Sequence, residues 1–405
     1  MVSAAGSNAL VSIMPSLAAA LEVPDVWISL SSSWAAVLWM VCAPRWARRS
    51  DRRGRKAMMA VGLWGFTGSM ALGGVFLWLG LNGMIGGVTT LLLFMAARSL
   101  YGLFGSAAPP AVQAYAAART PPEERTRIMA LVASSFGLGT VIGPALAPLM
   151  LLPGLGMAGP CLAFAFIGLA VLVALRLGLP HDSPGWEARG QPVSEPQGQG
   201  VEALGHHAHP QPEAVRLGWR EPRIAPWIIS MMLGFHAQAT VAGVTGFLVI
   251  DRLALRGDPE AAAGYVALVM MAGALATLVA QWGLIPNLHL GPRKASLWGL
   301  LVAAVGAALL ASAQGLHALA LGFAVSSVGF GLFRPGVTSG ASLAVERHEQ
   351  GAIAGITASI AGSAFIVTPT IGVWLYGHSV WGALGTTIFL CLAAAAIGRR
   401  GMVRD

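Results

Sequence analysis

Charged side chains are scarce in this chain of 405 residues: only 10% are charged, and no acidic residue lies well inside a long apolar run. A soluble domain usually carries about 25% charged residues, so this chain has too few to cover a surface that faces water. Hydrophobic residues make up 56%. Apolar runs of about 20 residues, long enough to cross a bilayer as a helix, recur along most of the sequence. The composition therefore predicts an all-α polytopic membrane protein.

Cysteine is rarer still, and its placement excludes further kinds of site. Cys42, Cys161 and Cys391 lie far apart within apolar runs, without disulfide or metal-ligand spacing. The sequence also has no phosphate-binding Gly-Lys-Ser/Thr loop, no His-Glu-x-x-His zinc pair and no convincing nucleophile elbow. We therefore expect packing roles for the cysteines, no metal or cofactor, and no enzyme activity.

Positive charge, by contrast, is plentiful, with a formal net charge of +8. In a soluble protein this would suggest nucleic acid, but here Arg and Lys gather in alternate connections between the apolar runs, above all in residues 45–56. Short cationic loops stay in the cytoplasm and face anionic lipid. The pattern predicts a multi-pass protein of the cell (inner or plasma) membrane, with both termini cytoplasmic and no nucleic-acid partner.

The apolar runs divide into twelve predicted spans. They cover residues 2–21, 27–46, 57–79, 85–117, 127–151, 157–178, 225–250, 260–285, 295–313, 317–345, 351–376 and 379–398. The first run lacks a basic n-region and is interrupted by polar residues such as Asn8, so we interpret it as a transmembrane helix and not as a signal peptide. It starts at Met1 without a preceding tail, and a true start further upstream stays open.

The spans fall into two sets of six. Residues 179–224 are rich in Pro, Gly, Gln, Glu and His without apolar periodicity, which predicts a flexible cytoplasmic linker. It would join an N-terminal six-helix half (1–178) to a C-terminal six-helix half (225–405). The His-His-Ala-His segment at residues 206–209 suits metal buffering, but we favour a solvated segment without a metal.

The two halves repeat each other. A shift of 225 residues lays Pro110 on Pro335 and Pro144 on Pro369, without a gap. Two pseudo-symmetric six-helix halves repeated in parallel are the layout of transporters whose halves rock around a central binding site. We therefore expect a monomeric protein that moves a small molecule across the lipid bilayer.

Three motifs stand within this layout. Residues 51–56 read Asp-Arg-Arg-Gly-Arg-Lys, residues 98–102 read Arg-Ser-Leu-Tyr-Gly, and residues 137–144 read Gly-Leu-Gly-Thr-Val-Ile-Gly-Pro. Through these motifs the chain resembles the major facilitator superfamily over nearly its whole length. Within that family it looks most like the twelve-span drug–proton antiporters, including tetracycline-type exporters, although Tyr101 replaces a usual Gln.

The resemblance implies a conformational latch made of Asp51, Arg52, Gly54, Arg55 and Lys56. The eleventh span begins near residue 351, so its N-terminus presents partial positive charge against which Asp51 can lie when the cytoplasmic side is shut. Arg52 and Arg55 would pair with acidic helix ends. Such a latch would bias one of two arrangements by about 1–3 kcal/mol. The alternative is that these charges only set the topology.

The other two motifs imply roles inside the spans. A guanidinium within a bilayer costs at least about 2.5–3.5 kcal/mol, so Arg98 should face the bundle interior and have a partner. By resemblance it helps proton transfer, the alternative being a brace between helices. Gly139 and Gly143 allow close helix approach and Pro144 bends the span, with Pro369 at the repeated position. In the family this motif accompanies exporters, which favours outward transport; ordinary helix packing is the alternative.

Only Arg98, His236 and Arg334 are ionisable and lie well inside predicted spans. His236 titrates near physiological pH and is either the proton site or a packing hydrogen-bonder. The two arginines, without embedded acids, leave positive potential in a low-dielectric cavity, which favours an anionic or zwitterionic substrate. We expect the substrate cavity to be lined by Arg334, Gln238, Trp34, Trp39 and Asn8.

The sequence thus predicts a secondary active transporter that exports a small amphipathic compound, a drug or a metabolite, by alternating access coupled to the proton gradient. An uptake or facilitative permease is the alternative within transport, favoured by the lack of a membrane carboxylate. A non-transporting membrane receptor or scaffold with the same fold is a remoter alternative.

Overall fold

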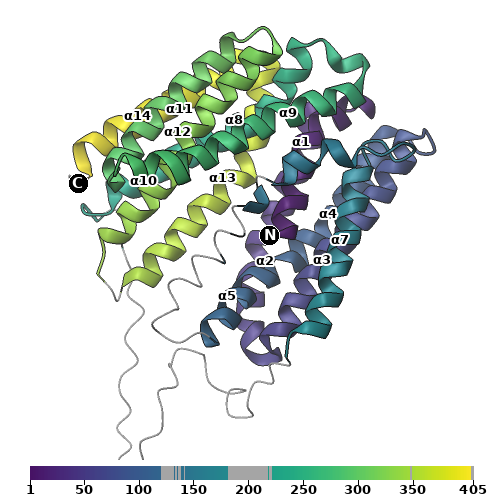
Figure 1. The fold of residues 1–405 in the computed structure, drawn as a ribbon, viewed down its shortest axis with the longest axis horizontal. Coiled ribbons are helices and arrows are strands. Elements are labelled where there is room, and N and C mark those ends of the chain that lie inside the picture. The colour runs from purple at the N-terminus through teal and green to yellow at the C-terminus, as the bar shows by residue number, and fades with distance from the viewer. Residues whose placement is uncertain are drawn as a thin grey trace, which may run out of the picture.

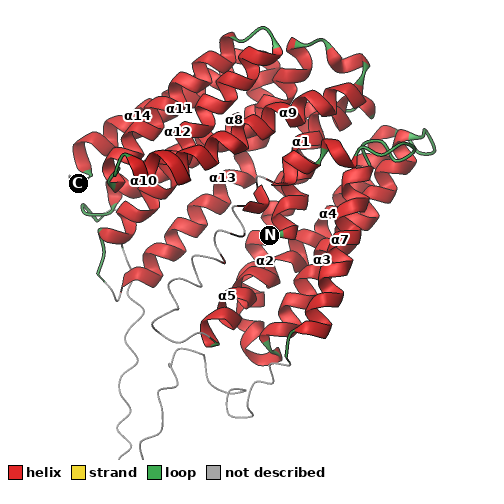
Figure 2. Cartoon of the chain, viewed as in Figure 1, coloured by secondary structure: helices red, strands yellow, loops and turns green. Residues whose placement is uncertain are grey.

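The computed structural model consists almost wholly of helices (Figure 2) and describes residues 1–119, 132, 135, 138–140, 142–180, 218, 221–346 and 349–402. The first group of helices comprises α1 (Val2–Ala20), α2 (Asp25–Arg53), α3 (Arg55–Leu81), α4 (Gly87–Phe104), η1 (Gly105–Ala107), α5 (Ala108–Ala118), η2 (Pro148–Met150) and α7 (Gly159–Gly178). The second group comprises α8 (Ala225–Arg252), η4 (Leu255–Gly257), α9 (Pro259–Leu278), the π-helix η5 (Val279–Leu284), α10 (Ile285–Asn287), α11 (Pro292–Ser312), α12 (Leu316–Leu343), α13 (Gln350–His378) and α14 (Val380–Gly401).

Eleven helical stretches of the described chain are long and apolar enough to cross a membrane. They coincide with eleven of the predicted spans, and the remaining prediction, residues 127–151, lies partly outside the described residues. Helices are the expected outcome for such sequences, because each backbone N–H and C=O in a bilayer must find its partner within the segment. The predicted all-helical polytopic fold is confirmed.

The connection predicted between the second and third spans is almost wholly helical, which corrects the expectation of a loop. α2 continues to Arg53 and α3 begins at Arg55, so Gly54 alone separates them. Arginine, which dominates this stretch, is a good helix former and lets α2 run beyond its apolar part. Gly54 has φ 89° and ψ 144°, a conformation that glycine adopts without a steric penalty, and the chain turns there.

The predicted span 85–117 corresponds to one membrane-spanning stretch, within which the α-helix is interrupted: it comprises α4, the 3-10 turn η1 and α5. Pro109 and Pro110 stand near the start of α5. Proline has no amide hydrogen, so these two residues cannot donate the hydrogen bonds that a continuous α-helix would need at this point. The break therefore falls just before them, at residues 105–107.

Figure 1 shows the two groups as neighbouring bodies, the first coloured purple to teal and the second green to yellow. Within the first group α3 packs on α4 and α7, and within the second α11 packs on α12 and α14. The groups meet where α1 contacts α8 and α9, and where α2 contacts α13. Toward the lower edge of the view α5 and the beginning of α13 lie apart.

Small residues bring α11 and α12 together. A Cβ atom added at Gly306 would lie 2.1 Å from the backbone nitrogen of Ser326, and one added at Gly329 would lie 2.2 Å from that of Ala303. Both distances are too short for a side chain, so the two backbones run in close contact. In lipid, where burial of apolar surface does not drive helices together, such close packing supplies much of the attraction.

Candidate functional site

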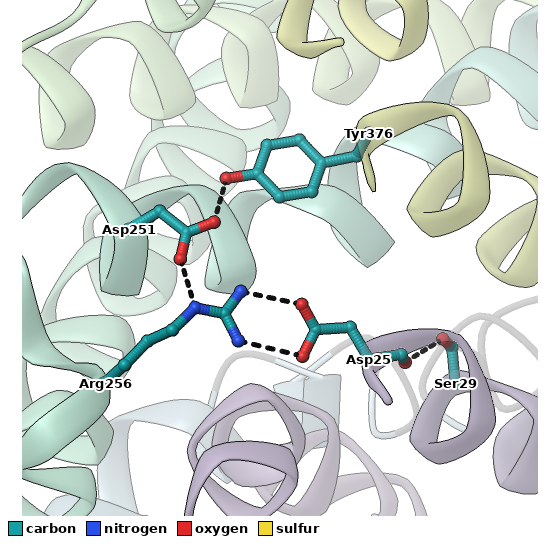
Figure 3. Close-up of polar contacts among 5 residues, drawn as sticks. All are labelled: Asp25, Ser29, Asp251, Arg256 and Tyr376. Carbon is teal, nitrogen blue, oxygen red and sulfur yellow. Dashed lines mark hydrogen bonds and ion pairs between the residues drawn. The ribbon is translucent and has the colours of Figure 1, made fainter. Parts of the chain in front are cut away.

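A cluster of polar and charged residues joins the two groups at one end of the molecule (Figure 3). Arg256 in η4 donates from Nη2 to Asp25 Oδ2 at 2.7 Å and from Nη1 to Asp25 Oδ1 at 3.3 Å. Its Nε donates to Asp251 Oδ1 at 2.6 Å, and the Tyr376 hydroxyl donates to Asp251 Oδ2 at 2.5 Å. Asp25 begins α2, Asp251 lies at the end of α8, and Tyr376 lies near the end of α13. We call these four residues the Arg256 clamp.

The clamp has good hydrogen-bond geometry but remains accessible to water. The side chains of Arg256, Asp25 and Asp251 are 50%, 20% and 33% exposed. Hydrogen bonds from Arg256 to Asp25 and to Asp251 raise the pKa of the guanidinium, which therefore stays charged. Exposed ion pairs contribute about 0.2–1 kcal/mol each. The clamp can thus bias the relative position of the two groups and still open at a small cost.

A hydrogen bond further along α2 adds to the contact between the groups. The hydroxyl oxygens of Ser33 on α2 and Thr370 on α13 lie 2.8 Å apart, although the residues are 337 positions apart in sequence. Ser33 is buried. α2 is therefore bound to the second group both by Asp25 of the clamp and by this direct hydrogen bond to α13.

Sequence reasoning missed the clamp, although a signal for it exists. Asp25, Asp251 and Arg256 lie in connections that alternate with the basic ones, in a chain where charge is scarce. Acids and a base in two such connections are candidates for an ion pair. The pairing itself joins residues 231 positions apart, which no local pattern specifies.

Arg98 lies in an aromatic cluster inside the first group. It is 6% exposed, and its Cζ lies 5.0 Å from the ring centroid of Tyr101, which is a cation–π distance. Trp39 and Phe66 flank the same ring, with centroids 5.1 and 5.7 Å away. Within the described residues, Nε and Nη1 of Arg98 have no hydrogen-bond partner. The Tyr101 ring therefore supplies a partner for this cation, and the cluster links α2, α3 and α4.

Arg334 has different surroundings in the second group. It lies inside the span formed by α12, yet its side chain is exposed, with Cζ 5.5 Å from the ring centroid of Phe235 on α8. Phe235 packs edge-on against Phe333, with 6.0 Å between centroids. Contact between a guanidinium and acyl chains costs at least about 2.5–3.5 kcal/mol. We therefore expect Arg334 to face a water-filled space rather than lipid.

His236 follows Phe235 on α8 and is partly buried, as is Gln238. The Nδ1 atom of His236 lies 2.7 Å from the carbonyl oxygen of Met232, one turn earlier on the same helix. A carbonyl oxygen can only accept, so Nδ1 carries the proton and Nε2 of the neutral ring is a proton acceptor. His236 can therefore act either as a proton site or as a packing residue.

Two other predicted cavity residues have polar partners on helices. Trp34 is exposed and donates from Nε1 to Ser99 Oγ at 2.8 Å, beside Arg98 on α4. Asn8 donates from Nδ2 to the Ala4 carbonyl oxygen at 2.8 Å, on its own helix. The structure thus brings Trp34 and Trp39 to the region of Arg98, whereas Asn8 makes its hydrogen bond within α1.

Lys56 of the predicted latch caps the end of another helix. Its side chain is 9% exposed, and Nζ donates to the carbonyl oxygens of Arg176, at 2.9 Å, and of Leu179. A cation is favourable at this position because the C-terminus of α7 carries partial negative charge. The side chains of Asp51 and Arg52 lie outside the described residues. Their predicted contacts with helix ends stay predictions.

The glycines of the third motif lie against α1. A Cβ atom added at Gly143 would be 2.1 Å from the carbonyl oxygen of Ala5, and Gly139 approaches the same helix. Only a glycine fits at either position. The repeated proline, Pro369, lies within α13 and is close to Gly243 of α8, where an added Cβ would be 3.2 Å from the proline Cα.

The family model of the Major Facilitator Superfamily matches residues 1–285, well over half of the chain. This chain therefore belongs to the Major Facilitator Superfamily. It is a multi-pass membrane protein and a secondary transporter of small molecules, not an enzyme.

Comparison with individual proteins agrees with this assignment. The chain is similar to the Staphyloferrin B transporter of Staphylococcus aureus (strain NCTC 8325 / PS 47), with 29% identity over 148 residues, which cover 35% of this chain and 32% of that protein. The match thus spans about a third of the relative's length. A bacterial homologue of the iron transporter ferroportin, crystallised in an inward-facing state, has a TM-score of 0.68 and 15% identity over 100% of this chain and 96% of its own. The human organic anion transporter MFSD10 (TETRAN) has a TM-score of 0.60 and 18% identity, covering 98% and 96%. At these identities the two structures share the fold.

Proposed function

We propose that this transporter exports a small anionic or zwitterionic amphipathic compound in exchange for protons. The observation that carries the proposal is Arg334, an exposed guanidinium inside a span that lies over the ring of Phe235. A cation beside an aromatic ring offers a charge partner to an anionic group and an apolar surface to the rest of the compound. Arg98 adds positive potential from the first group.

The substrate class follows from charge balance. Asp and Glu are absent from the interior of the predicted spans, so no fixed negative charge neutralises Arg334 there. A cation on the wall of a water-filled space inside the bilayer is less well solvated than in bulk water, and a bound anion relieves that cost. The similarity to a staphyloferrin B transporter over about a third of the chain supports a small organic compound as the substrate.

The transport cycle rests on two rocking halves, residues 1–178 and 225–405, joined by the linker 179–224. In the present arrangement the Arg256 clamp holds one end of the molecule together, and the helices diverge toward the opposite, basic end (Figure 1). With the basic end in the cytoplasm, this arrangement is inward-facing. The outward-facing state opens the clamp and brings Asp51 to the beginning of α13.

Proton coupling and direction depend on other residues. We assign the transported proton to His236 on α8, whose Nε2 can accept it while Nδ1 is bonded to the Met232 carbonyl. Residues 137–144 resemble the motif that accompanies exporters in this family, which supports outward transport. The second candidate function is a facilitative or uptake permease, which the lack of a carboxylate inside the spans favours.

Transport in inverted membrane vesicles tests the proposal. Vesicles that contain the protein are acidified inside and then supplied with organic anions, zwitterions and cations in turn. Antiport predicts that a transported compound accumulates in the vesicles while protons leave them, and the charge argument predicts that anions or zwitterions are favoured. Vesicles with Arg334→Ala are the control for substrate recognition.

Two results would contradict parts of the proposal. Accumulation of a compound without proton movement would favour the facilitative permease. A preference for organic cations, retained in the Arg334→Ala variant, would overturn the assignment of the substrate class.

A further inference from the structure

A groove with basic and apolar walls lies between the beginning of α11 and the end of α14. The groove is open on one side and has a volume of about 410 Å³. Six of the residues that line it are Arg293, Lys294, Leu297, Trp298, Leu392 and Arg399. No acidic residue is among those that line the groove within the described part of the chain. The groove therefore combines positive charge at one end with an apolar surface along its length.

One of its cations has a structural task. Arg293 donates from Nη2 to the carbonyl oxygen of Arg399 at 2.9 Å, and so caps the end of α14 much as Lys56 caps the end of α7. The side chains of Lys294 and Arg399 are exposed at the rim, and Arg400 follows on α14. The rim thus presents several positive charges outside the protein interior.

The position of the groove places it against the bilayer. α11 and α14 pack on each other and on helices of the second group, and Figure 1 shows them on the side of that group away from α1–α7. Trp298 is 59% exposed on the second turn of α11, where its indole ring can lie at the boundary between lipid headgroups and acyl chains. Leu392 is exposed as well, deeper along α14. Acyl chains can cover these side chains.

We propose that this groove binds an acidic phospholipid of the membrane. The phosphate of the headgroup lies between Lys294 and Arg399, and the amide groups at the uncapped N-terminus of α11 add positive potential. One acyl chain lies along Leu297, Trp298 and Leu392. Basic pockets between transmembrane helices at the membrane surface are suited to anionic lipid headgroups. A free phosphate ion has no apolar part that could contact the apolar wall.

Lipid retention by the intact protein tests the proposal. The purified full-length chain is placed in nanodiscs of mixed phosphatidylcholine and phosphatidylglycerol, and the lipids that it retains are counted by native mass spectrometry. Wild type should retain phosphatidylglycerol preferentially. The double variant Lys294→Gln/Arg399→Gln, which keeps the backbone carbonyl that Arg293 caps, should lose that preference by roughly tenfold, because each basic residue near the headgroup adds to the attraction.

A matched control separates the groove from net charge. Arg49→Gln/Arg119→Gln removes two exposed positive charges from the first group and should leave the preference intact. Equal losses in the two double variants would overturn the proposal, because they would show a general effect of charge. If the groove variant does not fold, Trp298→Ala replaces it as the test and should also weaken retention of phosphatidylglycerol.

Inorganic phosphate distinguishes a lipid from a soluble ion. Added phosphate should fail to displace the retained phosphatidylglycerol, because it lacks the acyl chain that the apolar wall binds. Displacement of phosphatidylglycerol by phosphate, with no effect of Trp298→Ala, would assign the groove to a soluble anion and overturn the lipid proposal. This result would leave the transport proposal untouched, since the groove and Arg334 are separate sites.

Discussion

The two groups of helices place their cations differently. In the first group Arg98 and Lys56 are buried, one against the Tyr101 ring and the other on the carbonyl oxygens that end α7. In the second group Arg334 and Lys294 are exposed. A buried cation is held by neighbours inside the protein, whereas an exposed one can bind a ligand that arrives from outside. We therefore propose structural roles for the first pair and ligand recognition for the second.

The largest effect is expected at Arg334. Arg334→Ala should abolish transport of an anionic compound, because it removes the positive charge over Phe235. Arg334→Lys keeps the charge without the planar guanidinium and should retain part of the transport. Initial rates in inverted vesicles measure both. Unchanged transport kinetics in Arg334→Ala would show that Arg334 does not recognise the substrate although it is exposed.

Arg98 should affect stability as well as transport. Arg98→Ala removes the cation–π contact with Tyr101 and leaves a space among aromatic rings, so we expect unfolding to become easier by about 2 kcal/mol or more. Thermal unfolding in detergent measures the loss. Ser99→Ala, which removes the acceptor of the Trp34 hydrogen bond on the neighbouring position, is the control and should have a smaller effect. A normal unfolding temperature for Arg98→Ala would contradict the structural role.

Lys56 and Lys294, in the first turns of α3 and α11, test the same contrast. Lys56→Gln should lower the free energy of unfolding by about 1.5–3 kcal/mol, since a buried charge-assisted hydrogen bond to α7 is lost. Lys294→Gln should change it by less than about 0.5 kcal/mol, because the side chain is exposed. Denaturant unfolding of both variants in the same detergent compares them directly. Equal losses in the free energy of unfolding of the two variants would mean that exposure does not distinguish a structural lysine from one that can bind a ligand.

The smallest effect is expected at the Arg256 clamp. Asp25→Asn weakens an exposed ion pair, which is worth about 0.2–1 kcal/mol, so the balance between inward-facing and outward-facing states should shift by up to about fivefold. Arg256→Gln should shift it in the same direction. Energy transfer between fluorophores placed on α2 and α9 reports the change. Tyr376→Phe, which leaves the Asp25 pair intact, should shift the balance less.

Much of the fold could be predicted because a bilayer leaves few choices. The apolar runs were long enough to identify the spans, and the motifs at residues 51–56 and 137–144 were enough to indicate the family. Boundaries were less certain where polar residues still favour helix. Arg45 to Arg53 extend α2 into the predicted loop, and only Gly54 ends it.

The candidate site was predicted only in part. Arg98 and Arg334 stood out because charge within a span is rare, and Trp39 proved to lie beside the ring that Arg98 contacts. Whether each arginine is buried or exposed did not follow from its local sequence. The clamp was not predicted because Asp25 and Arg256 look like ordinary surface charges in the sequence, and only the fold places them in contact.

The sequence by itself determined that this protein is a helical membrane transporter and where most of its spans begin and end. These properties depend on local composition, because a segment must satisfy its own backbone hydrogen bonds in lipid. Only the tertiary structure decided which cations are buried, which are exposed, and which charges join the two groups. Burial and ion pairing depend on side chains that arrive from other helices, and those neighbours are set by packing rather than by local sequence.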